Sequence, residues 1–367
     1  MSSTSVHAIP AGLVSAEDYE QHAEQCLSPA VFAHINGGSG NEHTLRRNRE
    51  AFEALTLQPR LLADCRHGNT RCELFGQAFR HPLLLAPVAL QALVHPEGEL
   101  ASAQGAAAME AGMVCSTLSS FTLEDIAARH PFGLWFQLYF QPRREHTLDL
   151  VRRAEAAGYR SLMVTLDTPV QAASPRAQRA GFSLPAGIQA ANLQRYPPPE
   201  RVTLGADQSI IFQGMMSEAP GWQDLEWLLD STGLPVIVKG VTHPTDATRL
   251  AKLGVRGQVV SNHGGRALDH APASLDCLPA IRRALGNDYP LLLDSGIRSG
   301  SDAFKALACG ANAVLIGRPC IHALAVAGAL GVAHVLKLLR EELELCMALT
   351  GCPTLKDISR EALFPIG

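Results

Sequence analysis

Eight short apolar runs recur along the chain, and each is followed by a segment with helical spacing. The runs do not alternate apolar with polar positions, so we expect them to be buried on both faces, as strands of a parallel sheet under helices are. Eight strand-then-helix units predict an α/β fold, a (β/α)8 barrel, built as one domain over residues 1–367. The predicted strands are residues 81–89, 112–120, 133–140, 161–169, 234–241, 257–265, 290–300 and 311–319.

Two regions depart from this repeat. Residues 1–80 precede the first strand and contain helix-like sequence, which predicts an N-terminal helical extension. Residues 183–223 separate the fourth and fifth strands and are rich in Pro, Gly and Gln. Because long loops on the carboxyl face of a barrel commonly act as lids, we expect this segment to cover an active site. Residues 331–351 predict a final amphipathic helix that closes the barrel.

Composition narrows the functional classes. The formal net charge is -4, so a nucleic-acid partner is not expected. No apolar stretch approaches the roughly 20 residues of a membrane span, so no membrane association is expected. Nine cysteines without a C-x-x-C spacing suggest reduced thiols in a cytoplasmic protein. No H-x-H or H-E-x-x-H pattern occurs, so no metal site is expected.

The turns after the seventh and eighth strands resemble phosphate-binding loops. In DSGIRSG and IGRP, glycines and an arginine stand between a strand and a helix: Gly296 with Arg298, and Gly317 with Arg318. Backbone N–H groups at a helix N-terminus bind phosphate, and a guanidinium adds charged hydrogen bonds. Barrels often hold a phosphate at these two strands, so a phosphate site is predicted here.

The stretch SNHGGRALDH, at the end of the sixth strand, carries the candidate chemistry. His263 suits proton transfer near neutral pH, and Asp167 at the end of the fourth strand is placed to orient it. Arg266 is suited to binding a carboxylate through two hydrogen bonds. Lys239, after the apolar PVIV, either pairs with Asp167 or Asp294 in a buried salt bridge or stabilises an electron-rich ring.

These residues also carry a family resemblance. The segments SNHGGRALDHAPASLDCLPAI, PVIVKGV, DSGIRSGSDAFKALACGANAVLIGRP, LAPVALQALVHPEGE and FQLYF resemble FMN-dependent 2-hydroxy-acid oxidases and dehydrogenases. The likeness covers roughly residues 15–360. It implies a (β/α)8 barrel that binds FMN and oxidises a small-molecule 2-hydroxy acid, with O2 or another electron acceptor. It also implies a homotetramer or octamer.

The resemblance assigns roles residue by residue. His263 would be the active-site base, oriented by Asp167. Tyr139 would bind the substrate's oxygen and Arg266 its carboxylate, while Lys239 would stabilise the reduced flavin. The other residues implied in cofactor binding are Pro87, Val88, Ala89, Ser119, Gln137, Thr165, Ser261, Asp294, Gly296, Arg298, Gly317 and Arg318.

Two positions depart from the family pattern. His34 replaces an N-terminal tyrosine that usually reaches the substrate carboxylate, and Ser174 replaces a second carboxylate-binding arginine. Arg176 is a candidate substitute two residues further on, and Phe121 a candidate wall of the substrate pocket. We therefore expect a substrate larger than glycolate or lactate, in contact with His34. Ala89 favours an oxidase, since alanine accompanies oxidases at this position.

Two alternatives remain open. The chain is another FMN barrel enzyme, such as an isomerase or a decarboxylating oxidase on an unusual acid, or it is a flavin-binding protein without catalysis. Stoichiometric hydrogen peroxide and 2-oxo acid would exclude an isomerase. Reduction of the flavin by any substrate would exclude the non-enzymatic alternative.

Overall fold

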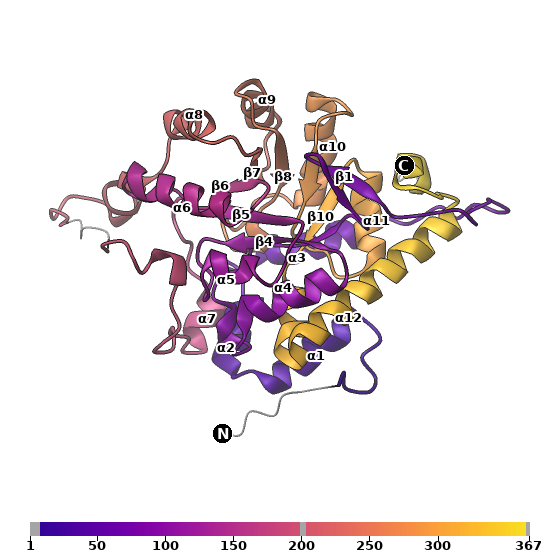
Figure 1. Ribbon diagram of the computed structural model, residues 1–367, viewed down its shortest axis with the longest axis horizontal. Coiled ribbons are helices and arrows are strands. Elements are labelled where there is room, and N and C mark those ends of the chain that lie inside the picture. The colour runs from indigo at the N-terminus through magenta and orange to yellow at the C-terminus, as the bar shows by residue number, and fades with distance from the viewer. Residues whose placement is uncertain (1–7, 199–202, 365–367) are drawn as a thin grey trace.

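The computed structural model describes residues 8–198 and 203–364, and its centre is a closed barrel of eight parallel strands (Figure 1). The strands run around the barrel in chain order, and the last closes against the first through the Leu83–Val314 register. The predicted (β/α)8 architecture is confirmed, with one strand in each apolar run. The strands are β3 (Leu83–Leu85), β4 (Gly112–Ser116), β5 (Leu134–Leu138), β6 (Leu162–Thr165), β7 (Val236–Val241), β8 (Gly257–Val260), β9 (Leu291–Leu293) and β10 (Ala313–Ile316).

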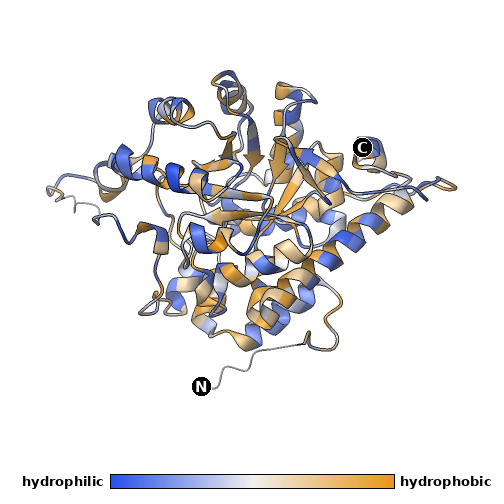
Figure 2. Ribbon diagram, viewed as in Figure 1, coloured by the Kyte–Doolittle hydropathy of each residue, from blue (hydrophilic) through white to orange (hydrophobic). Residues whose placement is uncertain are grey.

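Both faces of these strands are buried, which explains why the apolar runs do not alternate with polar residues. One set of side chains fills the barrel interior, and the neighbouring positions pack outward beneath the helices. Figure 2 shows the strands as mainly hydrophobic and the outer helices as mixed. The interior set includes Leu84, Val114, Trp135, Met163, Ile237, Val259, Leu292 and Leu315.

The N-terminal extension is only partly helical. Helices α1 (Ala16–Cys26), α2 (Pro29–Asn36) and α3 (His43–Glu53) agree with the expectation. They are followed by an antiparallel hairpin of β1 (Cys72–Leu74) and β2 (Gln77–Phe79), which the helical interpretation of residues 1–80 did not include. Phe75 and Phe79 pack edge-on against Trp135, with ring centroids 5.4 and 6.0 Å away. The hairpin therefore joins the hydrophobic interior of the barrel.

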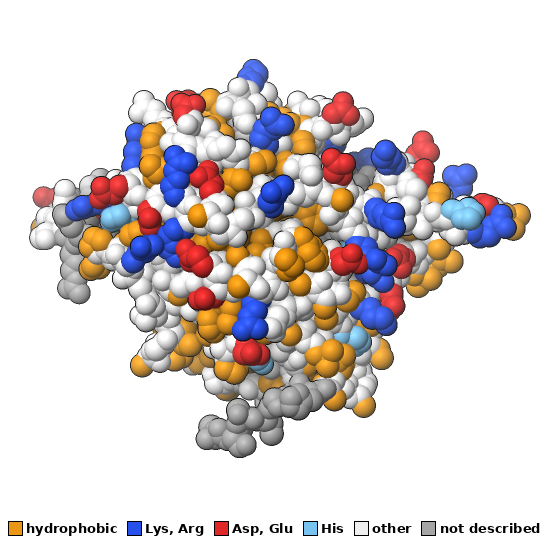
Figure 3. Space-filling model, in the orientation of Figure 1, with side chains coloured by type: hydrophobic (Ala, Val, Ile, Leu, Met, Phe, Trp, Pro, Cys, Tyr) orange, Lys and Arg blue, Asp and Glu red, His pale blue; other side chains and the backbone are white. Residues whose placement is uncertain are grey.

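Helices follow the strands and form the outer layer of the barrel. They hold the strands in register and leave the βα loops free to form a site at the carboxyl ends of the strands. On the face shown in Figure 3, acidic and basic side chains are interspersed. The helices are α4 (Gly98–Ala108), α5 (Leu123–Ala127), α6 (Arg144–Ala156), α7 (Pro175–Arg179), α8 (Trp222–Ser231), α9 (Pro244–Lys252), α10 (Ser274–Leu285), α11 (Gly300–Ala308) and α12 (Arg318–Thr350).

The last helix, α12, begins directly after β10 and so is longer than the predicted residues 331–351. Its backbone is interrupted by non-helical dihedrals at Ala327 and Gly328. By length and composition alone, α12 is long and apolar enough to span a membrane, so the expectation that no apolar stretch would be was wrong. Within the protein, 72% of its most apolar window is buried. It packs against α1, α4 and α11, which accounts for its apolar surface.

The long segment between β6 and β7 has two parts with different packing. In the first, Tyr196 stacks on His146 of α6 with centroids 4.7 Å apart and donates a hydrogen bond to Asp149. In the second, a π-helical turn at Ile210–Gly214 and a 3₁₀ turn at Met215–Glu218 expose large apolar side chains. Residues 199–202 of the predicted 183–223 loop lie outside the described residues.

Candidate active site

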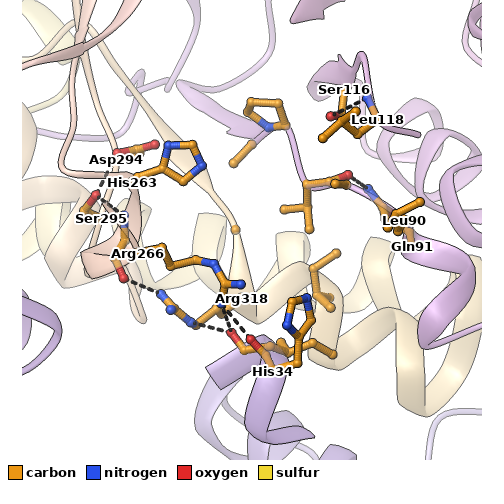
Figure 4. Close-up of a pocket in the computed structure, with 18 of the residues that line it drawn as sticks. His34, Leu90, Gln91, Ser116, Leu118, His263, Arg266, Asp294, Ser295 and Arg318 are labelled. Carbon is orange, nitrogen blue, oxygen red and sulfur yellow. Dashed lines mark hydrogen bonds between the residues drawn. The ribbon is translucent and has the colours of Figure 1, made fainter. Parts of the chain in front are cut away.

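A cavity of about 540 Å³ lies at the carboxyl ends of the barrel strands, with walls from the βα loops and from α2 (Figure 4). Most of the predicted site residues meet there, although they come from all parts of the chain. The predicted residues that line it are His34, Pro87, Val88, Ala89, Gln137, Tyr139, Thr165, Lys239, His263, Arg266, Asp294, Gly296, Arg298, Gly317 and Arg318.

His263 and Asp167 form the pair that the sequence predicted. Nδ1 of His263 lies 2.9 Å from Oδ1 of Asp167, so this contact places the proton on Nδ1 and leaves Nε2 as the basic nitrogen. The backbone N–H of His263 donates to Oγ of Ser261 at 3.0 Å, and His263 adopts a left-handed φ of 59°. A non-glycine residue keeps a left-handed backbone only where the surrounding structure imposes it. The position of the His263 ring is therefore fixed by its neighbours.

Lys239 is buried between two carboxylates. Its Nζ lies 3.4 Å from Oδ2 of Asp294 and 3.8 Å from Oδ2 of Asp167. Burial alone would lower the pKa of Lys239, but the two carboxylates outweigh it and raise the pKa above its ordinary value. Burial raises the pKa of Asp167, yet Lys239 and His263 together hold it below its ordinary value. The lysine is therefore cationic at the edge of the cavity, and it both forms the predicted salt bridges and faces a ligand site.

Gly240 allows this arrangement. It has a φ of 108°, and a Cβ at this position would lie 2.5 Å from Cβ of Asp167. Any side chain here would push the strand that carries Lys239 away from Asp167. The glycine after the apolar PVIVK run is thus required by the close approach of β7 to the loop after β6.

Tyr139 faces the same cavity from the end of β5. Its backbone N–H donates to Oγ1 of Thr117 at 3.1 Å, and its hydroxyl accepts a weak hydrogen bond from Thr168 at 3.4 Å. Burial raises the pKa of Tyr139, so the phenol remains protonated at neutral pH and retains a proton to donate. It is placed to hydrogen-bond an oxygen of a ligand in the cavity.

Arg266 crosses the cavity toward α2, as Figure 4 shows. Its Nη1 donates to the carbonyl oxygens of His34 at 2.6 Å and Gly37 at 3.0 Å. Its hydrogen bonds to described residues use Nη1, so Nε and Nη2 are the nitrogens left for a ligand carboxylate. The guanidinium also affects its neighbour: burial and then the positive charge of Arg266 lower the pKa of His34 to about 4. His34 is therefore neutral at pH 7.

A second group of cations lies deeper, where the sequence predicted a phosphate. Arg318 is partly buried, and burial followed by the charges of Arg298 and Arg266 lowers its pKa to about 9. Its guanidinium donates to the carbonyl oxygens of Ile35, Gly264 and Gly37 at 3.0 to 3.1 Å. Burial also lowers the pKa of Arg298. Partly buried guanidiniums that repel one another are stabilised most by a multiply charged anion.

The residues present fit FMN. Nε2 of Gln137 and Oγ1 of Thr165 are buried, line the cavity and have no hydrogen-bond partner among the described residues. Oε1 of Gln137 is held by Oγ of Ser116 at 3.2 Å, which turns Nε2 toward the cavity. The amide of Gln137 and the hydroxyl of Thr165 are suited to hydrogen-bond the carbonyl and imide edge of a flavin ring. Lys239 is suited to the electron-rich side of that ring, and Arg298 and Arg318 are suited to the phosphate of FMN.

Five predicted site residues do not line the cavity, and one of them is Asp167, which acts through His263. Ser119 donates to the carbonyl of Phe121 and accepts from Asn192, and Ser261 accepts from the backbone of His263, so both act on neighbouring residues. Phe121 packs against the hydrophobic core. Arg176 forms an ion pair with Glu42 and is not among the residues that line the cavity, whereas Ser174 lines it. Because Arg176 is paired with Glu42, it does not take the position of a second carboxylate-binding arginine in the cavity.

Two further residues belong to the site and were not predicted. The imidazole of His34 stacks on Phe182, which also lines the cavity, with centroids 3.9 Å apart. Ser295 accepts from the N–H of Gly264 at 2.9 Å and donates to Asp294 at 2.8 Å, so it joins the loops after β8 and β9. Ser295 lies inside the DSGIRSG motif, so it could have been predicted from the sequence. No local pattern around Phe182 indicates that it stacks on His34.

A base held by a carboxylate, beside a cavity that fits a flavin, is the arrangement of an oxidoreductase that acts on a CH–OH group. Over residues 23–365, the sequence matches the family model described as FMN-dependent dehydrogenase. The chain belongs to this family of FMN-dependent 2-hydroxy-acid oxidases, and its cofactor is FMN.

Known relatives match over nearly their whole length. An L-lactate oxidase of Alicycliphilus denitrificans is 57% identical over 357 residues, which cover 97% of this chain and 98% of the relative. A peroxisomal (S)-2-hydroxy-acid oxidase of Oryza sativa subsp. japonica is 38% identical, with 96% of both chains covered. Among solved structures, a mandelate oxidase with (S)-2-phenylpropionate superimposes with a TM-score of 0.86 at 40% identity, covering 96% of this chain and 98% of that one.

Proposed function

We propose that this protein oxidises a 2-hydroxy acid larger than glycolate or lactate to the 2-oxo acid, with dioxygen as electron acceptor and hydrogen peroxide as second product. The His263–Asp167 pair, facing a cavity with Arg266 on its other side, is the observation that carries the proposal. The oxidases among the relatives support dioxygen as acceptor.

In this reaction, the chain's own residues bind the acid and move one proton. Arg266 binds the carboxylate through Nε and Nη2, and Tyr139 hydrogen-bonds the oxygen at C2. Nε2 of His263 takes the hydroxyl proton, and Asp167 stabilises the imidazolium that forms. Bound FMN supplies the acceptor for the electron pair that leaves C2. Lys239, held cationic by its carboxylates, stabilises negative charge that develops next to it.

The proposed substrate size rests on what surrounds Arg266. His34 is neutral, Ser174 carries no charge and Arg176 is paired with Glu42, so Arg266 meets the carboxylate without a second charged ligand from these positions. Each missing charged hydrogen bond removes about 1.5–3 kcal/mol from the binding of a small acid. The stacked rings of His34 and Phe182 offer a flat apolar face instead. A bulky or aromatic side chain recovers binding energy there by burying apolar surface.

The test is anaerobic reduction of the purified flavoprotein by a panel of 2-hydroxy acids, from glycolate to aryl acids, in both enantiomers. We expect a large or aryl acid to bleach the flavin and glycolate to do so poorly. Comparable rates with glycolate would contradict the proposed substrate size alone. If no acid bleaches the flavin, the proposed reaction itself is wrong. Equal amounts of hydrogen peroxide and 2-oxo acid after admission of air would establish the oxidase reaction.

A further inference from the structure

A second cavity, of about 380 Å³, lies beside the active-site cavity. Its walls are the loops after β5 and β6 on one side and residues 215–225 on the other. The two cavities share two wall residues, Tyr139 and Thr165. We call the second one the side cavity. It therefore adjoins the active-site cavity on the side of the exposed part of the long segment, not on the side that α2 covers.

The side cavity differs from the active-site cavity in charge. Four cations line the active-site cavity: Lys239, Arg266, Arg298 and Arg318. Among the described residues, the charged side chain that lines the side cavity is Glu218, and most of the others are apolar, namely Phe140, Pro142, Leu166, Pro169, Met215, Met216, Ala219, Pro220, Trp222 and Leu225. An anionic acid is attracted to the first cavity and repelled from the second. The side cavity is suited to a small, neutral, apolar molecule.

The outer wall of the side cavity is adaptable. Met215 and Met216 are 47% and 39% exposed, and their unbranched side chains change rotamer readily. The inner wall is more rigid, because β5 and β6 fix Tyr139 and Thr165 at their carboxyl ends. A molecule that enters past the methionines therefore meets the active site at these two residues.

We infer that the side cavity binds dioxygen and delivers it to the active site past Tyr139 and Thr165, separately from the hydroxy acid. The inference rests on the proposed oxidase function. Dioxygen takes up the two electrons and two protons that the acid has lost and becomes hydrogen peroxide, so the sum is 2-hydroxy acid plus O2 to 2-oxo acid plus H2O2. With a separate entrance through the side cavity, dioxygen can arrive while the active-site cavity is still occupied by the acid or its product.

The test narrows the side cavity in the holoenzyme and measures the two half-reactions separately. Ala219→Phe places a large ring in the wall, and Ser217→Phe, at an exposed position of the same segment outside the lining, is the matched control. By stopped flow, we expect Ala219→Phe to slow reoxidation of the reduced flavin by dioxygen about tenfold. Anaerobic reduction by the acid should be unchanged, and Ser217→Phe should change neither rate.

Xenon provides a readout that does not depend on activity, because it occupies apolar cavities. Crystals pressurised with xenon should show it in the side cavity of the wild type and not in Ala219→Phe. The smaller Ala219→Leu gives a graded version of the same test if the phenylalanine variant does not fold.

Two results would overturn the inference: normal reoxidation in a folded Ala219→Phe variant that has lost the xenon site, or equal slowing of both half-reactions. If no 2-hydroxy acid reduces the flavin, the proposed function fails by itself. Reoxidation can still be measured after photochemical reduction, so the two failures are distinguishable.

Discussion

His34 and Phe182 are stacked nearly parallel, with ring centroids 3.9 Å apart and an interplanar angle of 7°. One ring comes from α2 near the N-terminus, and the other follows α7 in the long segment after β6. The contact joins α2 and the segment after α7 into one wall of the active-site cavity. It also sets the imidazole beside Arg266, whose charge helps to keep it neutral.

His34→Tyr should increase activity on small acids. A phenol at this position adds one hydrogen bond to the carboxylate held by Arg266, worth about 1.5–3 kcal/mol, or roughly 10- to 100-fold in kcat/KM for glycolate or lactate. Steady-state kinetics with glycolate and with an aryl acid measure the change in preference. Phe182→Leu is the control, because it disturbs the stack without adding a hydroxyl. An equal gain in both variants would show that the stack, and not the new hydroxyl, controls small-acid binding.

Asp167→Asn should abolish most of the proton transfer while FMN remains bound. The amide no longer stabilises the imidazolium of His263 and permits the wrong tautomer, which in other His–Asp pairs lowers kcat by about 10⁴-fold. We expect a comparable loss in the anaerobic rate of flavin reduction. The yellow spectrum of the purified variant shows whether the flavin is retained. A reduction rate within a few-fold of the wild type would mean that Asp167 has only a structural role.

Arg318→Ala should weaken FMN binding. The charged hydrogen bonds that this guanidinium would donate to the phosphate are worth about 1.5–3 kcal/mol each, so the Kd for FMN should rise at least about tenfold. Flavin fluorescence during titration of the apoprotein measures this Kd. Arg249→Ala, which removes a guanidinium stacked over Trp222 on the outer layer, should leave it unchanged. Equal Kd values for the two variants would argue against a phosphate site at Arg318.

Stability should rise with pH between about 4 and 6.5. Burial, followed by nearby arginines, lowers the pKa of His322 to about 3 and that of His81 to about 4, from an ordinary value of 6.5. Between these pH values the unfolded chain binds protons at the two histidines and the folded chain does not. The contribution of these histidines to the free energy of unfolding is therefore complete above pH 6.5 and is lost as the pH drops toward 4. Urea unfolding at several pH values should show this slope, and His322→Gln should flatten it. An identical slope in that variant would locate the titrating group elsewhere.

The fold was predictable because the barrel repeats one pattern eight times. Runs such as 81–89 and 311–319 are apolar throughout, and burial on both faces is the physical reason. The hairpin at residues 72–79 escaped prediction because its strands are three residues each, too short to show a period. The start of α12 was also misjudged, because IGRP was assigned to a strand end and a turn, whereas α12 begins within it at Arg318.

The site was predictable where residues follow strand ends, as Lys239, His263 and Asp294 do. It was not predictable where the partner lies far away in the chain. The ion-pair partner of Arg176 is Glu42, and the stacking partner of His34 is Phe182. Neither contact has a local signature, because both arise only when α2 packs against α7.

Closure of the barrel through β3 and β10 has a consequence for synthesis of the protein. The ribosome makes β3 early and β10 only near the end of the chain, so the growing sheet keeps two unpaired edges throughout translation. Unpaired strand edges with apolar faces are prone to intermolecular pairing. A nascent chain that stalls before Ile316 can neither close the ring nor bury its first strand. Truncated products should therefore aggregate, and recombinant yield should depend on chaperones that protect an incomplete barrel.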